Sequence, residues 1–198
     1  MGPVRVLAAG GRGPAAARNA GWRAASTPWV VFLDDDVVPA PGWPAAVAGD
    51  LAGLPADVAG SQGRIRVPPP DRRLTDSELA TAALSSARWI TADMAYRRSA
   101  LAEADGFDET FRRAYREDTD LALRVLDRGY RLVRGDRLTV HPLRGGGVWG
   151  SVAAQRGNAD DVVMRRRHGA RWRRRVGEAR GRFRVHLATT AALALSGA

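Results

Sequence analysis

The chain of 198 residues contains no cysteine and no lysine, and it has no long apolar run. Without cysteine it has no disulfide bonds, no thiolate metal site and no thiol nucleophile. This composition fits a reducing cytoplasm, which is the location that we expect. No stretch reaches the ~20 apolar residues that a transmembrane helix needs. The apolar stretch at 185–198 covers only 14 residues, so we expect a docked helix, a linker or an interfacial anchor there.

Positive charge is concentrated in one part of the chain. The formal net charge of the chain is +10, and its 31 strongly basic residues are all arginine. Residues 164–184 hold ten arginines and one acidic residue, whereas the rest of the chain holds 21 arginines and 20 acidic residues. Few aromatic residues interleave with the cluster, unlike the stacking platforms of single-strand nucleic-acid binders. Nucleic acid is therefore not an expected partner, and the cluster is a candidate for peripheral contact with the inner face of a membrane.

The pattern of apolar residues predicts one α/β domain, because strands and helices alternate and the length suits a single core. "WVVFL" has the composition of a strand that is buried on both faces. Thr75 and Glu78 have the spacing of a capping box. The predicted elements are a strand at 29–33, a helix at 43–54, a short strand at 63–67, a helix after Thr75, a strand or turn followed by a short helix over 90–107, a helix after the acidic pair at 117–118 that ends near Gly129, and a strand after it.

Three aspartates, Asp34, Asp35 and Asp36, directly follow the first predicted strand. Adjacent carboxylates raise one another's pKa unless water or a cation stabilises their negative charge. Ligands of open α/β sheets gather at the carboxyl ends of strands, and extended geometry points Asp34 and Asp36 the same way. Carboxylate oxygens suit Mg²⁺ or Mn²⁺. The segment therefore predicts a metal site, with a solvated turn or a helix N-terminus as the alternative.

Glu117 and Asp118 form a second acidic pair just before a well-marked amphipathic helix. Asp118 suits either of two roles, that of a helix cap or that of a general base. The two acidic sites together match the needs of one reaction, which neither site indicates alone. Glycosyl transfer from a nucleotide sugar needs a metal that steadies the leaving diphosphate and a carboxylate that takes the acceptor proton.

The glycine-rich segment "LAAGGRG" near the start has two interpretations. It is similar to the opening of sugar nucleotidyltransferases, in which backbone amides cradle phosphate. Glycines also form ordinary turns between a strand and a helix. A nucleotidyltransferase would be expected to place a lysine in the phosphate-binding region, and this chain has none.

Several segments in order resemble the family 2 glycosyltransferases of GT-A type, over roughly residues 4–170. They are "ARNAGW", "WVVFLDDDVVPAPGW", "ADMAYRRSALAEADGFDETF", "YREDTDLALRVLDRGYRLV" and "HPLR". The resemblance implies an α/β fold with a GT-A-like, Rossmann-like sheet and flanking helices at 1–170, followed by a basic linker and apolar tail at 171–198. It also assigns the glycines to the turn before the helix that carries Arg18 and Asn19.

The resemblance further implies roles for individual residues. Asp118 would be the catalytic base, with Glu117 as its partner in the motif. The remaining roles are metal binding for Asp34, Asp36 and His141, donor binding for Arg18, Asn19 and Asp35, and a place in the acceptor or pocket wall for Asp93, Arg64 and Trp149. His141, as neutral imidazole, could reach the metal. A structural role is the alternative for His141, Arg18, Asn19 and the wall residues.

Complete members of this family begin with two further strand–helix units that bind the nucleoside. Val4–Leu7 would then be the third strand, so we expect an upstream start, a shortened form or a protein that has lost donor binding. The predicted function is metal-dependent, inverting sugar transfer from a nucleotide-diphosphate sugar to a carbohydrate or glycolipid acceptor, in cell-surface polysaccharide or glycolipid synthesis. The alternatives are a non-catalytic remnant that binds a partner or an anionic membrane through residues 164–184, and a sugar nucleotidyltransferase.

Overall fold

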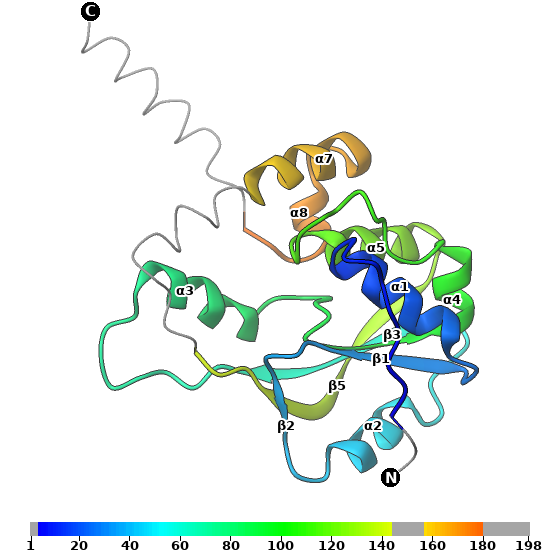
Figure 1. Cartoon of the computed structure of the whole chain (residues 1–198), viewed down its shortest axis with the longest axis horizontal. Helices are drawn as coiled ribbons and strands as arrows, with labels where there is room; N and C mark the ends of the chain where they lie inside the picture. Colours follow the sequence, from blue (N-terminus) through cyan, green and yellow to red (C-terminus); the bar gives the residue numbers. More distant parts are fainter. Residues whose placement is uncertain (1–3, 144–156, 180–198) are drawn as a thin grey trace, which may run out of the picture.

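The computed structural model describes residues 4–143 and 157–179, and it confirms the predicted α/β class (Figure 1). Its elements in chain order are α1 (Pro14–Ala24), β1 (Trp29–Leu33), β2 (Val38–Pro39), α2 (Trp43–Leu51), β3 (Val58–Arg66), α3 (Asp76–Ala82), the 3₁₀ turn η1 (Ala83–Ser85), β4 (Asp93–Arg97), α4 (Arg98–Glu103), α5 (Glu117–Asp127), β5 (Arg131–Val140), α7 (Asn158–His168) and α8 (Trp172–Arg175). No helix in these ranges is long and apolar enough to cross a membrane.

The five strands form one mixed sheet in the order β1-β4-β3-β5-β2. β3 and β5 run parallel, and the other neighbours are antiparallel. Leu33 at the end of β1 pairs with Asp93 at the start of β4, and Arg66 at the end of β3 pairs with Val140 at the end of β5. The carboxyl ends of β1, β3 and β5 therefore lie at one end of the sheet, which is where the acidic segment and His141 emerge.

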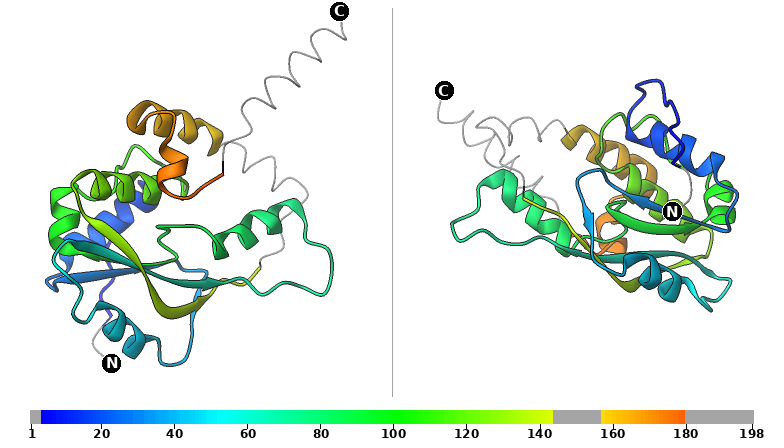
Figure 2. Two further views of the ribbon diagram at one scale, coloured as in Figure 1. Left: turned by 180° about the vertical axis from the view of Figure 1, so that it is seen from behind. Right: turned by 60° about the horizontal axis from the view of Figure 1, so that its bottom comes forward.

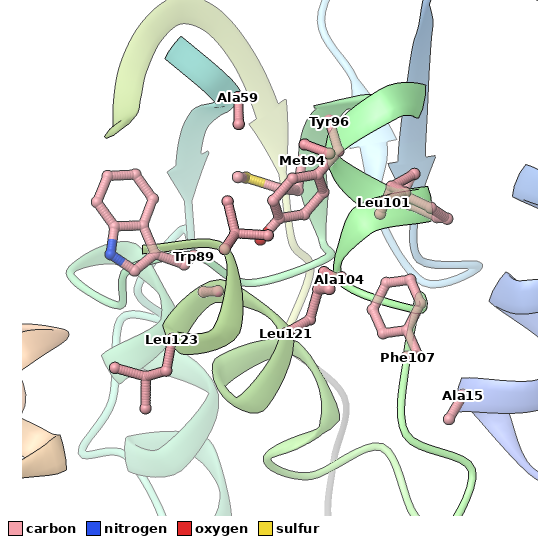
Figure 3. Close-up of a cluster of buried hydrophobic side chains, with 14 of the residues drawn as sticks. Ala15, Ala59, Trp89, Met94, Tyr96, Leu101, Ala104, Phe107, Leu121 and Leu123 are labelled. Atoms are coloured by element: carbon pink, nitrogen blue, oxygen red, sulfur yellow. The ribbon is translucent and has the colours of Figure 1, made fainter. Parts of the chain in front are cut away.

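Helices cover the two faces of the sheet unequally. α1, α4 and α5 lie on one face with α7 and α8 beside them, whereas α2 lies on the opposite face (Figures 1 and 2). The main core forms under the larger layer and includes Phe32, Met94, Tyr96, Leu101, Phe107, Phe111, Leu121 and Leu123. Figure 3 shows Met94 and Tyr96 of β4 in this cluster, with the ring of Tyr96 directed toward α5. Burial of these apolar side chains is the main force that fixes α5 on the sheet.

Local sequence signals explain where two helices begin or end. Thr75 and Glu78 form the predicted capping box at the start of α3. Gly129 follows α5 with φ 85°, a conformation that glycine adopts without strain, and it lets the chain turn into β5. α2 ends earlier than predicted, and β3 is longer because its first residues pair with β4 and β5.

The structure corrects the prediction that 29–33 is buried on both faces. β1 pairs only with β4 and forms one edge of the sheet in the described chain. Phe32 alone is buried in this strand, and Leu33 is exposed.

Val4–Leu7 does not form the predicted strand. Val4 and Val6 are 92% and 91% exposed, and this segment has no strand partner among the described residues. Without a ladder to pair with, its β-branched composition is not enough to make it a strand.

The packed unit extends past residue 170, where the sequence predicted a linker. Met164, Trp172 and Val176 are fully buried members of the main core. The described part of the basic segment is therefore built into the fold, rather than appended to it.

Candidate active site

The acidic segment 34–37 joins β1 and β2, which form the two edges of the sheet. Asp34 and Asp36 are partly exposed, and Asp35 is exposed. This short connection crosses the end of the sheet at which three strands finish. It therefore places carboxylates where open α/β sheets bind their ligands.

Arg18 of α1 connects the two acidic sites. Its Nη2 donates to Asp34 Oδ1 at 2.7 Å, and its Nη1 donates to Glu117 Oε1 at 2.6 Å. Burial alone would lower the pKa of Arg18, but the two carboxylates raise the pKa above its ordinary value. The guanidinium therefore stays charged and joins the end of β1 to the start of α5.

Glu117 is a buried carboxyl that is only half satisfied. It is 2% exposed, and its Oε2 atom has no hydrogen-bond partner in the described structure. Burial, and then the neighbouring Asp118, raise the pKa of Glu117 to about 8, against the opposing effect of Arg18. This residue is suited to hold a proton near neutral pH.

Asp118 is the more accessible of the two acidic neighbours. It is the second residue of α5, and Arg116 occupies the N-cap position. The Thr119 amide donates to Asp118 Oδ1 at 2.6 Å. Burial raises the pKa of Asp118, although the Thr119 amide and Arg18 oppose the shift. Asp118 thus satisfies one free amide of the helix end while part of its surface remains open to solvent.

His141 faces Asp36 where β5 ends. His141 Nδ1 lies 3.1 Å from the Pro142 carbonyl oxygen, which can only accept, so Nδ1 carries the proton. His141 Nε2 lies 3.5 Å from Asp36 Oδ2. Imidazole nitrogen and carboxylate oxygen are both ligands that Mn²⁺ accepts, so this pair is a candidate for holding a divalent ion.

The three predicted metal ligands do not converge. Asp34 turns to Arg18 instead of joining Asp36 and His141, and within 4–143 and 157–179 no three acidic or histidine side chains are grouped to hold one ion. The guanidinium of Arg18 supplies the positive charge that Asp34 faces. Asp36 and His141 remain as a pair that fits a divalent ion whose other ligands are phosphate and water.

Asn19 and Asp93 have structural roles, in contrast to the predicted donor and wall positions. The Asn19 side-chain nitrogen donates to the Phe107 carbonyl oxygen and to Glu109. The Asn19 side-chain oxygen accepts from the Phe107 amide and from the Trp22 indole nitrogen. The carboxylate of Asp93 is fully buried and accepts from Arg137, Thr139 and Trp43. The polar atoms of both side chains are thus engaged in hydrogen bonds within the protein.

Arg64 lines a cavity of about 450 Å³ between β3, β5 and η1, whose other lining residues are Gln62, Gly63, Ile65, Ser85, Arg134, Gly135 and Asp136. It also forms an exposed ion pair with Asp136. Trp149 lies outside the described residues.

Sequence reasoning missed Arg137 and Arg116, which both hold the site's surroundings in place. Arg137 is fully buried between Asp93 and Asp50. Arg116 has φ 74° just before the acidic pair. No pattern in the sequence separates these two from the other arginines.

Comparisons with known proteins identify the family of the chain. The model of "Glycosyl transferase family 2" matches residues 2–119. The chain is 33% identical over 133 residues to the pre-mycofactocin glycosyltransferase of Mycobacterium tuberculosis, covering 61% of this chain and 28% of that protein. The chain thus spans less than a third of the length of this curated relative. The match from residue 2 does not confirm the expected lack of an N-terminal portion.

Two solved structures share the fold at low sequence identity. A mannosyltransferase from Pyrobaculum calidifontis, solved with GDP-mannose and Mn²⁺, has a TM-score of 0.50 and 22% identity over 77% of this chain and 42% of its own. Glucosyl-3-phosphoglycerate synthase from Mycobacterium tuberculosis, solved with Mn²⁺, UDP-glucose and phosphoglyceric acid, has a TM-score of 0.51 and 18% identity over 79% of this chain and 55% of its own. The α/β fold is that of the GT-A transferases, and the chain belongs to glycosyl transferase family 2.

Proposed function

We propose that the chain carries the catalytic part of a glycosyltransferase that moves a sugar from a nucleotide-diphosphate sugar to an acceptor hydroxyl. The observation that carries this proposal is the bridge made by Arg18, which brings the acidic segment after β1 to the acidic pair of α5. The family match and the nucleotide sugars bound by two structural neighbours support it.

Asp118 is the proposed catalytic base. It is partly exposed, whereas Glu117 is buried and hydrogen-bonded to Arg18. An ionised Asp118 would accept the proton of the acceptor hydroxyl as that oxygen attacks the anomeric carbon. Attack by the acceptor itself is a single displacement, so we propose inversion at that carbon. Glu117 would hold its own proton and keep Arg18 in place.

Asp36 and His141 are the proposed protein ligands of Mn²⁺ or Mg²⁺. When bound, the ion would supply positive charge that steadies the leaving diphosphate. Asp34 would remain with Arg18 and fix the start of the acidic segment, while Asp35 and Arg18 face the donor side. Arg64 and its cavity are proposed for the acceptor, which we place among the carbohydrates or glycolipids of cell-surface synthesis.

The test replaces Asp118 by Asn, which keeps the shape and can still accept from the Thr119 amide. Release of nucleoside diphosphate from UDP-glucose and GDP-mannose is followed with Mn²⁺ and with a chelator. We expect turnover to need the metal and to fall ~10² to 10⁴-fold in Asp118→Asn, the usual loss for a positioned base. Donor affinity and melting temperature should stay near those of the wild type.

Asp127→Asn is the matched control, because Asp127 lies at the other end of α5 and is exposed. It should turn over normally. An Asp118→Asn protein that melts early but turns over normally would make Asp118 a structural residue, and Glu117 would become the candidate base.

A second candidate function is contact with an anionic membrane surface. Arg165, Arg166, Arg171 and Arg174 are all exposed around α7 and α8. This role is compatible with catalysis, and it also fits a non-catalytic relative that has only kept the surface.

A further inference from the structure

The residue that precedes the acidic pair has a strained backbone. Arg116 is the N-cap of α5 and has φ 74° and ψ −13°, in the left-handed region. A side chain with a Cβ atom rarely adopts this conformation, and such residues persist only where their surroundings hold them. The Arg116 side chain does not cap the helix, so capping does not explain it.

Contacts from the C-terminal helices hold the Arg116 side chain. Its Nε donates to Asp161 Oδ1 of α7 at 2.8 Å, and its Nη1 donates to Glu178 Oε1 just after α8 at 2.5 Å. Its Nη2 donates to the Tyr115 hydroxyl at 3.0 Å. The guanidinium also lies 4.7 Å from the centre of the Trp172 ring. We call these five residues the Arg116 clamp.

The clamp is itself anchored in the core. Trp172 is 3% exposed, and Arg173 stacks on its ring with a distance of 4.5 Å to the centroid. Arg173 also pairs with Asp161 of the clamp. At the start of α7, a Cβ atom on Gly157 would lie 2.8 Å from Tyr115 Cδ1, so glycine permits this close approach. The side chain of Arg116 therefore cannot move without breaking contacts in two helices.

The backbone of Arg116 sets the direction in which α5 begins. Its carbonyl accepts the amide of Asp120 at 2.8 Å, which is the first turn of the helix. The next residue, Glu117, points inward to Arg18. A different backbone conformation at residue 116 would turn the peptide that leads into Glu117 and Asp118 and break this alignment.

We propose that Arg116 is a positioning residue for the reaction, held in its strained conformation by α7 and α8 so that Asp118 keeps its productive orientation. This proposal rests on the proposed function. It gives the C-terminal helices a part in catalysis although none of their residues is placed in the acidic site.

The test compares Arg116→Ala with Arg116→Gly in the full chain. Both lose the clamp contacts, but glycine tolerates the left-handed backbone whereas alanine does not. We expect kcat to fall ~10²-fold in Arg116→Ala, the cost of a small misplacement. KM for the nucleotide sugar should stay within about twofold of the wild-type value. The kcat of Arg116→Gly should be about tenfold higher than that of Arg116→Ala. Glu178→Gln should lower kcat in the same way without removing the arginine.

Hydrogen exchange gives a second readout that needs no substrate. The Asp120 amide should exchange about tenfold faster in Arg116→Ala than in Arg116→Gly. Arg175→Ala is the matched control, because it breaks an ion pair with Asp127 between α8 and the opposite end of α5. Its kcat and its Asp120 exchange should equal those of the wild type.

Equal kcat in the glycine and alanine variants, or an equal loss in Arg175→Ala and Glu178→Gln, would overturn the positioning role. Should the wild type release no diphosphate from either nucleotide sugar, the proposed function fails on its own. The Asp120 exchange rates then test whether the Arg116 clamp holds the first turn of α5. Unchanged rates overturn this role, and the expected order of rates supports it.

Discussion

At the scale of single residues, the buried carboxyl of Glu117 links folding to pH. Burial and Asp118 raise its folded-state pKa from 4.5 to about 8. A group whose pKa is raised on folding contributes stability that is present below its unfolded pKa and is lost as the pH rises through its folded pKa. The contribution of Glu117 is therefore lost between about pH 4.5 and about pH 8, and Asp118, whose pKa is also raised, acts in the same direction.

We expect Glu117→Gln to remove this dependence. The free energy of unfolding of the wild type, relative to Glu117→Gln, should fall by a few kcal/mol (~1.4 kcal/mol per unit of pKa shift) from pH 5 to pH 8.5. Urea unfolding at a series of pH values measures it. Glu103→Gln, which changes an exposed carboxylate on α4, should leave the profile of the wild type unchanged. Parallel profiles for the wild type and Glu117→Gln would mean that Glu117 is ionised in the fold throughout.

The positions of the acidic residues could be predicted from the sequence, but their partners could not. Asp34, Asp36, Glu117 and Asp118 stand out because carboxylates at the ends of apolar elements need an explanation. Arg18 joins residues that are 16 and 99 positions away. That bridge depends on how α1 packs, and a single sequence does not contain that information.

At the scale of elements, a buried arginine organises β5 and α2. Arg137 is 1% exposed, and its guanidinium binds Asp93 at 2.6 Å and Asp50 at 3.0 Å. The register of β5 against β3 shifts between Gln62 and Arg64, which makes room for it. Glycines close to the network leave space for the carboxylates, since a Cβ on Gly135 would lie 2.0 Å from Asp50.

We expect Arg137→Met to destabilise the protein by about 3–5 kcal/mol, because it leaves two carboxylates buried without their cation. Arg131→Met is the matched control on the same strand. Arg131 pairs with Asp57, and both side chains are more than half exposed, so its loss should cost less than about 1 kcal/mol. Chemical denaturation of the two variants measures the difference. Equal effects would show that the buried network contributes no more than a surface pair.

Element prediction succeeded where the chain carries local signals. The capping box of α3 and the glycine after α5 are such signals, and both ends are confirmed. It failed for β1, whose apolar composition indicates a central strand although its place in the sheet is at the edge. Position in a sheet is set by pairing with distant strands, so composition alone cannot fix it.

At the scale of the whole molecule, the basic segment divides into two kinds of arginine. Arg167, Arg173 and Arg175 form ion pairs with Asp108, Asp161 and Asp127 of the fold. The four exposed arginines named above around α7 and α8 remain directed to solvent. Charge counting along the sequence cannot make this distinction, because it depends on which acids α7 and α8 meet when they dock.

We expect the protein to bind anionic vesicles through the four exposed arginines. Replacing Arg165, Arg166, Arg171 and Arg174 by Gln should weaken binding to vesicles that contain phosphatidylglycerol by about 10²- to 10³-fold, since each charge near the surface contributes ~1 kcal/mol. Sedimentation with vesicles at 0.1 M and 1 M salt measures it, as the Debye length falls from ~10 Å to ~3 Å.

The control removes the same number of exposed charges elsewhere, at Arg23, Arg98, Arg112 and Arg128, and should bind nearly as well as the wild type. Equal binding to phosphatidylcholine vesicles, or equal loss in the two quadruple variants, would rule out a membrane surface at α7 and α8.

The place of β1 at the edge of the sheet also bears on aggregation. Its sequence, WVVFL, is apolar, uncharged and rich in β-branched residues, and its outer side pairs with no strand in the part of the chain that the structure describes. An open edge of that kind is a template onto which another chain can add a strand. Pro28 precedes it and three aspartates follow it, and flanking proline and charge of this sort act as gatekeepers. We therefore expect Asp34, Asp35 and Asp36 to protect solubility in addition to their proposed part in the site. Variants that remove them need a check of their monomeric state before any loss of turnover is attributed to chemistry.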